Sequence, residues 1–169
     1  MDVISTSRLA LRQLGPPDAP FILTLLNEPS FVQFIGERNV RSIADAERYI
    51  LTGPVASYER FGFGLWRVAL KGGDVPIGMC GLLKRDALDD VDLGFALLPA
   101  FWRQGYATEA AQAVLAYGKQ AFGLERVVAI TSPGNERSER VLAKLGFVFE
   151  RMTRLTPSDK EVRLLAHQT

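Results

Sequence analysis

The sequence has few of the residues on which many enzymes depend. Its 169 residues include one cysteine, Cys80, and one histidine, His167. A single cysteine excludes an intramolecular disulfide and a zinc site made of several cysteines, and a single histidine excludes a histidine metal cluster within one chain. A catalytic triad would have to use His167, which lies close to the last residue and which we expect to be solvated. We therefore expect no metal site.

An excess of charge and a long apolar run are also absent. Lysine and arginine number 20 against 19 aspartate and glutamate, which gives a formal net charge of +1. Because the basic residues are scattered, we expect neither a nucleic-acid partner nor a membrane partner. No apolar run approaches the roughly 20 residues of a membrane span, and no apolar signal core follows the first residues. We expect a cytoplasmic protein with a single domain over residues 1–169.

The pattern of apolar residues predicts both strands and helices. Helices are predicted at 18–26, 42–53, 106–122 and 135–145, and strands at 9–12, 63–70, 76–84, 89–98, 126–131, 147–155 and 162–166. The turn Lys71-Gly72-Gly73-Asp74 predicts a hairpin between the second and third strands. Three consecutive strands therefore precede a β-α-β crossover. This order predicts a mixed, mostly antiparallel sheet with helices on its faces, in the α+β class.

The most informative segment is residues 92–111, where an apolar strand leads through a proline into a helix. The turn reads Trp102-Arg103-Gln104-Gly105-Tyr106-Ala107-Thr108-Glu109-Ala110. A helix N-terminus carries unpaired N–H groups and about half a positive charge, so it readily binds anions. Gly105 and Ala107 leave the approach to these N–H groups free of bulky side chains. We interpret the turn as a pyrophosphate site.

Two common pyrophosphate motifs do not fit. No Gly-x-x-x-x-Gly-Lys-Ser/Thr string occurs, and Gly62-Phe63-Gly64 lacks a third glycine and precedes a strand. The strand, proline, small-residue turn and helix instead resemble the acyl-CoA site of the GNAT superfamily of N-acetyltransferases. That family's turn reads Arg/Gln-x-x-Gly-x-Gly/Ala; Gly105 and Ala107 match its last two places, and Trp102 departs from its first.

Further strings resemble the Rim-type ribosomal-protein (alanine) N-acetyltransferase branch. They are Trp102 followed by Gly-Tyr-Ala-Thr-Glu-Ala, Thr6-Ser7-Arg8-Leu9-Ala10-Leu11-Arg12, Asn135-Glu136-Arg137-Ser138 and Lys144-Leu145-Gly146-Phe147. The resemblance covers nearly the whole chain. It implies the GNAT acyl-CoA N-acyltransferase fold and transfer of an acetyl group from acetyl-CoA to a primary amine in a ternary complex. The acceptor would be a protein N-terminus or a small molecule, and the enzyme a monomer or homodimer.

The resemblance also implies which residues hold acetyl-CoA. The strand ending near Leu98 should splay from the strand ending near Thr131, so that the pantetheine arm pairs like an extra strand. Asn135 would line the far wall of this split or cap the following helix, and both roles can hold together. The implied binding residues are Ala96, Leu97, Arg103, Gln104, Gly105, Tyr106, Ala107, Thr108, Asn135 and Ser138.

The chemistry needs a neutral amine, a donor to the oxyanion and a stabilised leaving sulfur. Many relatives carry a tyrosine acid seven or eight residues after the asparagine, where this sequence has Leu142 and Ala143. We therefore expect Ser138 to donate a hydrogen bond to the sulfur, and a backbone N–H near Leu97 or Leu98 to bind the oxyanion. Asp92 is the candidate base, acting through water, with a solvated strand-end carboxylate as the alternative. Glu150 is the second candidate base.

Aromatic residues are candidates for the walls of the acceptor pocket. They are Phe31, Phe34 and Trp66, together with Tyr58 and Phe61, and the alternative for each is a place in the hydrophobic core. The competing functions are a catalytically silent acyl-CoA-binding module, which the missing tyrosine favours, and a nucleotide-binding regulator.

Overall fold

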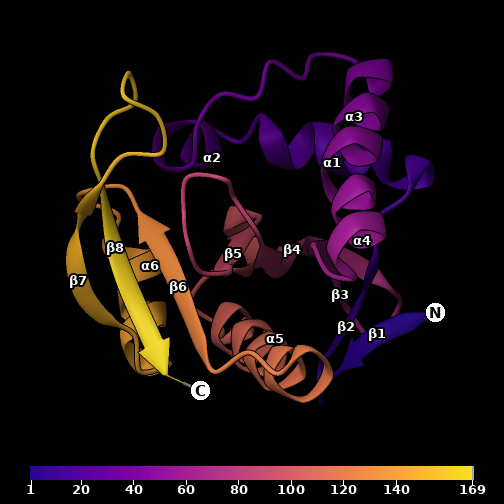
Figure 1. The fold of residues 1–169 in the computed structure, drawn as a ribbon. Coiled ribbons are helices and arrows are strands. Elements are labelled where there is room, and N and C mark those ends of the chain that lie inside the picture. Colours follow the sequence, from indigo (N-terminus) through magenta and orange to yellow (C-terminus); the bar gives the residue numbers. More distant parts are fainter. Residues whose placement is uncertain (169) are drawn as a thin grey trace.

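The computed structural model describes residues 1–168 as one mixed sheet with helices on both faces (Figure 1). The sheet has eight strands in the order β1-β2-β3-β4-β5-β6-β8-β7. The strands are β1 (Asp2–Ser5), β2 (Leu9–Gln13), β3 (Leu65–Leu70), β4 (Val75–Leu83), β5 (Asp92–Leu97), β6 (Arg126–Thr131), β7 (Val148–Thr153) and β8 (Val162–Gln168). The helices are α1 (Ala19–Leu26), α2 (Pro29–Phe34), α3 (Ile43–Ile50), α4 (Ala56–Phe61), α5 (Tyr106–Phe122) and α6 (Glu136–Lys144). None of the helices in residues 1–168 has the length and apolar character needed to span a bilayer.

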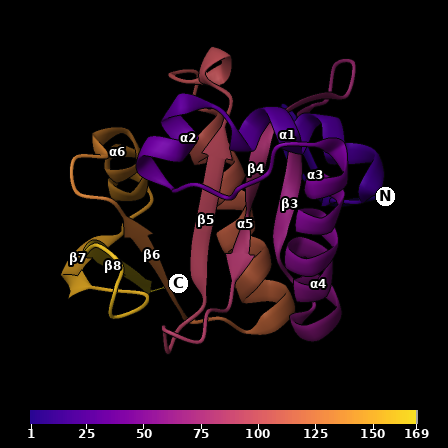
Figure 2. The same ribbon diagram turned by 90° about the horizontal axis from the view of Figure 1, so that it is seen from above.

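The chain enters the sheet as an antiparallel meander and then changes to a parallel crossover. Each strand from β1 to β4 pairs antiparallel with the next, and the predicted hairpin turn joins β3 to β4. The chain then passes through α5 to β6, which lies parallel to β5. Helix α5 lies on the face of the sheet opposite to α1 and α3 (Figures 1 and 2). This is the α+β arrangement that the sequence predicts.

Helix α5 can approach the sheet closely because its buried side carries mostly small residues. Ala110, Ala111 and Gly118 are buried there, and a Cβ at Gly118 would lie 3.1 Å from the side chain of Leu82. A second buried cluster fills the other face, where α1 and α3 pack over Met79. Each large apolar side chain buried in such clusters contributes about 1.5–3 kcal/mol. The sheet is thereby held between two helical layers.

The sheet divides between β5 and β6. These strands share one residue pair, Asp92 with Val128, although β5 continues to Leu97 and β6 to Thr131. Figure 2 shows β6 diverging from β5 beyond this point. On its other side, β5 pairs with β4 along its whole length. The splay expected from the sequence is confirmed, and it leaves one edge of β5 without a neighbouring strand.

Several elements differ from the sequence prediction. The predicted helix does not end near Gly53, because a π-helical turn over Leu51–Val55 accommodates Pro54 and leads directly into α4. The sequence pattern also missed β1 and α2. These elements have four and six residues, too few to show a periodicity. In contrast, the bounds of α5 and the Ser42 cap of α3, which accepts from the Asp45 N–H, are confirmed.

Asp18 ties the start of α1 to the sheet. Its carboxylate accepts from both Arg12 Nη atoms at 2.9 and 2.8 Å and from the Gly15 N–H at 2.9 Å. Burial alone would raise the pKa of Asp18, but the hydrogen bonds from Arg12 and Gly15 outweigh burial and lower the pKa. A lowered pKa in the folded state means that the ionised carboxylate stabilises the fold. This stabilisation is present above the ordinary carboxyl pKa and is lost as the pH falls through the folded-state pKa.

Asp18→Asn should therefore lower the free energy of unfolding by about 3 kcal/mol at neutral pH, as expected when a buried ion pair loses one partner. The difference from the wild type should shrink as the pH falls through the folded-state pKa. Urea unfolding at a series of pH values measures both. Asp89→Asn, at an exposed position, is the control and should change stability by less than about 0.5 kcal/mol. A difference that does not depend on pH would contradict the assignment.

Candidate active site

A cavity of about 660 Å³ lies at the split, bounded by β5, the start of α5, α2 and α6. Nine of the ten residues predicted to bind acetyl-CoA line this cavity: Ala96, Leu97, Arg103, Gly105, Tyr106, Ala107, Thr108, Asn135 and Ser138. Gln104 does not line it. Its side chain instead donates to the carbonyl of Ala100 at 3.1 Å. Residues from three separate parts of the sequence thus meet in one cleft.

The start of α5 presents free backbone donors to this cavity. Gly105 is the N-cap, with φ of +81° and no side chain to cap the helix. The first backbone hydrogen bond of the helix runs from the Glu109 N–H to the Gly105 carbonyl at 3.0 Å. The N–H groups of the preceding helical residues therefore have no partner within the helix, and those residues line the cavity. The anion site predicted for this turn has the expected geometry.

The turn before α5 is clamped by the segment that joins β1 to β2. The Glu109 carboxylate accepts from Thr6 Oγ1 at 2.6 Å, from the Arg8 N–H at 3.1 Å and from Arg8 Nε at 2.6 Å. Arg8 also donates to the Gln104 carbonyl at 3.0 Å. Burial would raise the pKa of Glu109, but the hydrogen bonds from Thr6 and Arg8 lower it. The clamp neutralises Glu109 and fixes the turn beside the anion site.

Positive side chains gather on the opposite wall of the cleft. Arg103, Arg137, Arg140 and Lys144 line the cavity. The Arg137 guanidinium lies 3.2 Å from the centroid of the Trp102 ring. Burial and the charge of Arg103, which lines the same cavity, together lower the pKa of Arg137. The sequence prediction missed Arg137, although it directly precedes Ser138 in the Asn-Glu-Arg-Ser string.

Alternation along β5 decides which backbone groups face the split. The Leu98 N–H donates to the Ile77 carbonyl of β4 at 2.8 Å. Because the hydrogen bonds of an antiparallel ladder alternate, the N–H of Leu97 points away from β4 and toward the split, whereas Ala96 pairs with Met79. Of the two N–H groups expected to bind the oxyanion, only that of Leu97 is therefore free of a bond to β4. The prediction that the backbone of Ala96 binds an arm in the split is wrong, and this residue lines the cavity without offering its backbone.

Asn135 and Ser138 form a unit at the start of α6. The Asn135 Oδ1 accepts from the Ser138 N–H at 3.4 Å, and its Nδ2 lies 3.1 Å from Ser138 Oγ. Since the amide oxygen caps the helix, the amide NH₂ donates to the hydroxyl. The hydroxyl then keeps its own proton for another acceptor in the cleft. Both readings of Asn135, as helix cap and as cavity wall, hold together.

Comparison with known proteins places the chain in a family. The Acetyltransferase (GNAT) domain family matches residues 8–148. The chain is also 32% identical to the uncharacterized N-acetyltransferase YoaA of Bacillus subtilis, over 90% of this chain and 86% of that protein. This chain belongs to the GNAT acetyltransferase family. It is accordingly an acyltransferase enzyme.

Solved structures share the fold of this acetyltransferase. An acetyltransferase from Agrobacterium tumefaciens matches with a TM-score of 0.84 and 23% identity, over 98% of this chain and 94% of that chain. RimL, a ribosomal L7/L12 alpha-N-protein acetyltransferase in complex with coenzyme A, matches with a TM-score of 0.77 and 15% identity, over 99% of this chain and 98% of that chain. At these identities the likeness shows the fold alone. The GNAT fold expected from the sequence is confirmed.

A second cavity of about 180 Å³ adjoins the main cleft of the acetyltransferase. The residues that line both cavities are Phe31, Phe34, Ile35, Phe95, Ala96, Asn135 and Ser138. Phe31 and Phe34 thus lie where the sequence predicts walls of an acceptor pocket. Ser138 lies at the junction, where a group bound in one cavity can meet a group bound in the other.

Asp92 lies in the second cavity, away from the junction. It is 1% exposed, and Arg85 Nε lies 3.2 Å from each of its carboxylate oxygens. Burial raises the pKa of Asp92, and the charge of Arg85 opposes this rise. The alternative of a solvated strand-end carboxylate is therefore wrong. Asp92 precedes Ala96 by four residues, about 13 Å along the strand, so it is out of direct reach of the junction.

Trp66 does not line either cavity of the acetyltransferase. It is 1% exposed in the core beneath α5, with its ring centroid 5.6 Å from that of Tyr117. Side chains alternate along β3, so Leu65 faces the second cavity and Trp66 faces the other side. Tyr58 and Phe61 are likewise part of this core cluster. Glu150 on β7 pairs with Arg126 at 2.7 Å and lines neither cavity.

Arg8→Met tests whether the clamp prepares the turn for an anion. Loss of Arg8 frees the Gln104 carbonyl and leaves the Glu109 charge uncompensated beside the anion site. Coenzyme A should then bind about tenfold more weakly, which corresponds to about 1.4 kcal/mol in titration calorimetry. Arg48→Met, on an exposed side chain of α3, should leave the affinity unchanged. Equal affinities for both variants would show that the clamp has no such role.

Proposed function

We propose that this enzyme transfers the acetyl group of acetyl-CoA to a primary amine by direct attack. One observation carries the proposal: the uncapped start of α5 opens into the split beside β5, so an anion site and an unpaired strand edge share one cavity. The coenzyme A bound to RimL, a protein of the same fold, supports acetyl-CoA as the donor. Turnover of acetyl-CoA with a panel of amines tests the proposal, and binding of acetyl-CoA without turnover of any amine would contradict it.

The residues in the cleft fit the parts of acetyl-CoA. The N–H groups of Tyr106, Ala107 and Thr108 offer donors to the pyrophosphate, and Arg103 and Arg137 offer positive charge. The edge of β5 that faces the split is open to the extended arm. Two guanidinium groups that line one cavity repel each other unless an anion lies nearby. The chemistry of the cleft therefore favours a carrier with several phosphate charges.

The mechanism follows from the groups at the junction. The nitrogen lone pair attacks the thioester carbonyl, the carbon–sulfur bond breaks, and the amine proton leaves. The Leu97 N–H binds the developing oxyanion, and the Ser138 hydroxyl donates to the departing sulfur. A thiol with a pKa of about 8.5 leaves without full protonation, so the absence of a tyrosine near Leu142 does not prevent the reaction. Most of the acceleration comes from positioning.

Asp92 is the proposed acceptor of the amine proton. It cannot touch the amine at the junction, so the proton passes through water in the second cavity. A buried carboxylate with a raised pKa is a better base than a solvated one. We also propose that the enzyme belongs to the Rim-type branch of the family. A protein N-terminus and a small amine are both candidate acceptors for the second cavity, which adjoins the main cleft.

Gly105→Glu tests the anion site. A carboxylate at the uncapped start of α5 competes for the same N–H groups, so coenzyme A binding should be lost. Gly123→Glu is a matched control, because Gly123 has φ of +65° at the other end of the same helix, with nothing within 4 Å of its Cβ position. Both variants carry similar backbone strain, and only Gly105→Glu should lose affinity in calorimetry. Retained affinity in Gly105→Glu would refute the site.

Ser138→Ala tests the hydrogen bond to sulfur. Removing one donor to a charged atom costs about 1.5 kcal/mol, so kcat should fall about tenfold. The affinity for acetyl-CoA should change much less, because the sulfur gains its charge only during the reaction. Ser158→Ala, in an exposed loop far along the chain, should leave both values unchanged. A wild-type kcat for Ser138→Ala would remove this residue from the mechanism.

A further inference from the structure

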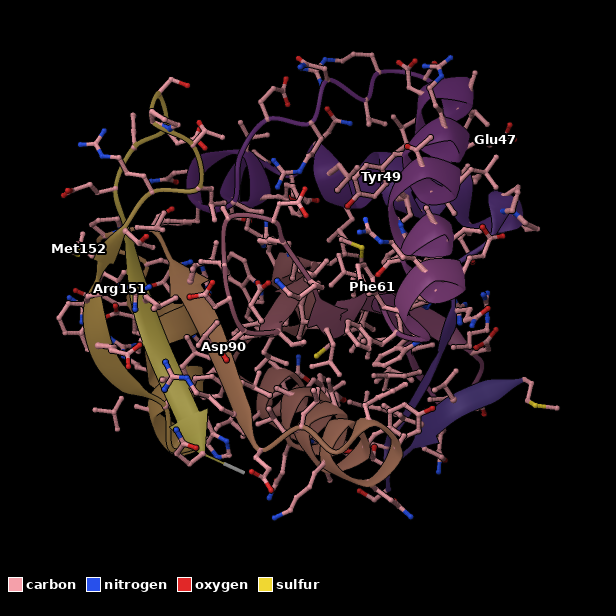
Figure 3. All side chains as sticks on the ribbon, viewed as in Figure 1. Glu47, Tyr49, Phe61, Asp90, Arg151 and Met152 are labelled. Atoms are coloured by element: carbon pink, nitrogen blue, oxygen red, sulfur yellow. The ribbon has the colours of Figure 1, made fainter. Side chains whose placement is uncertain are left out.

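The second cavity holds polar groups that the proposed transfer does not use. Arg38 lies between α2 and α3, Tyr49 lies on α3, and Arg85 follows β4, and all three line the cavity. Tyr49 projects inward from its helix, whereas Glu47 on the same helix faces solvent (Figure 3). Burial raises the pKa of Tyr49, and the charges of Arg38 and Arg85 oppose this rise. The phenol and both guanidinium groups thus belong to the lining of the same cavity.

The charges in this cavity do not balance. Arg85 is neutralised by Asp92, whose oxygens lie 3.2 Å from its Nε. Arg38 is an exposed residue that forms no ion pair with an acidic side chain among residues 1–168, and its guanidinium carbon lies 5.9 Å from the centroid of the Phe31 ring. The neighbouring Glu37 is paired with Arg41. Of the charged residues that line the cavity, Arg38 is therefore left without a neutralising partner, and the lining keeps one positive charge.

The surroundings of Arg38 make the cavity favour an anionic group over a cationic one. The other walls are mostly apolar, and include Phe34, Met79 and Leu93. A second cation would be repelled in such a cavity and would lose its hydration, whereas a carboxylate would gain a guanidinium and a phenol as donors. The volume of about 180 Å³ is below the roughly 300–1,000 Å³ of sites for drug-sized ligands. The cavity therefore suits a small molecule or the first residue of a chain.

We propose that the acceptor is a small amine that also carries a carboxylate, with the carboxylate bound by Arg38 and Tyr49 and the amine directed toward Ser138. This inference rests on the proposed acetyl transfer and adds the class of acceptor. A free amino acid and the acidic first residue of a peptide share this chemistry. Polyamines and aminoglycoside-like polycations are disfavoured by the same charge.

The experiment compares each acid with its neutral amide. Glycine, alanine, β-alanine and phenylalanine are assayed with acetyl-CoA beside glycinamide, alaninamide, β-alaninamide and phenylalaninamide. Free aspartate and the dipeptide Asp-Ala are assayed beside them to represent a free amino acid and the acidic first residue of a peptide. Values of kcat/KM are corrected for the fraction of neutral amine. At least one acid should exceed its amide by about tenfold or more, as expected for a charge-assisted hydrogen bond. The kcat/KM of free aspartate compared with that of Asp-Ala shows whether the carboxylate belongs to a free amino acid or to the first residue of a peptide.

Variants of Arg38 test whether its charge causes the preference for an acid over its amide. Arg38→Met should lower kcat/KM with the acid at least tenfold more than kcat/KM with the amide, and Arg38→Lys should keep part of the preference. Arg48→Met, on the exposed side of α3, should keep the wild-type ratio. These readouts separate recognition of the carboxylate from a general loss of structure, which would lower both rates together.

Calorimetry with coenzyme A separates this inference from the proposed function. If coenzyme A does not bind, the proposed function fails. If it binds and neutral amines or polyamines are acetylated as well as the acids, the function stands and the inference is overturned. The inference is also overturned if coenzyme A binds and no acid in the panel is acetylated, or if Arg38→Met keeps the wild-type ratio.

Discussion

The single residue pair between β5 and β6 is the constraint on which the site depends. Strands that paired further would use the Leu97 N–H in the sheet and close the cavity. The carbonyl of Leu97 is instead bonded by Trp102 Nε1 at 3.0 Å, so this part of the open edge has a partner without a strand. The same indole supports Arg137. A departure from the family pattern at Trp102 thus joins the backbone of β5 to the positively charged wall.

The start of α5 can attract an anion only because other residues of the chain neutralise the carboxylate of Glu109. Glu109 lies in the first turn, where it would repel phosphate groups if its charge were free. Hydrogen bonds from Thr6 and Arg8 remove this repulsion and hold the Gln104 carbonyl in place. The segment between β1 and β2 is far from α5 in sequence, yet it helps to shape the anion site. This contact gives a physical reason for the Thr-Ser-Arg string near the start of the chain.

Local signals in the sequence predicted much of the fold and of the donor side of the site. The turn at Gly105, the long apolar face of α5 and the cap at Asn135 each depend on neighbouring residues, and the structure confirms their positions. The π-helical turn around Pro54 was missed, because glycine and proline normally end a helix. The backbone of Ala96 was misassigned, because the phase of a ladder depends on pairing with β4.

The acceptor side could not be predicted in the same way, because its residues come from segments that only the fold brings together. Trp66 was a natural candidate by composition, yet a shift of one residue along β3 puts Leu65 in the cavity in its place. Asp92 by itself suggested a base or a solvated carboxylate. Beside Arg85 it also cancels a charge, and this cancellation leaves Arg38 as the net charge of the cavity. The preference that we propose for the acceptor thus depends on charges from separate segments of the chain, which no single motif contains.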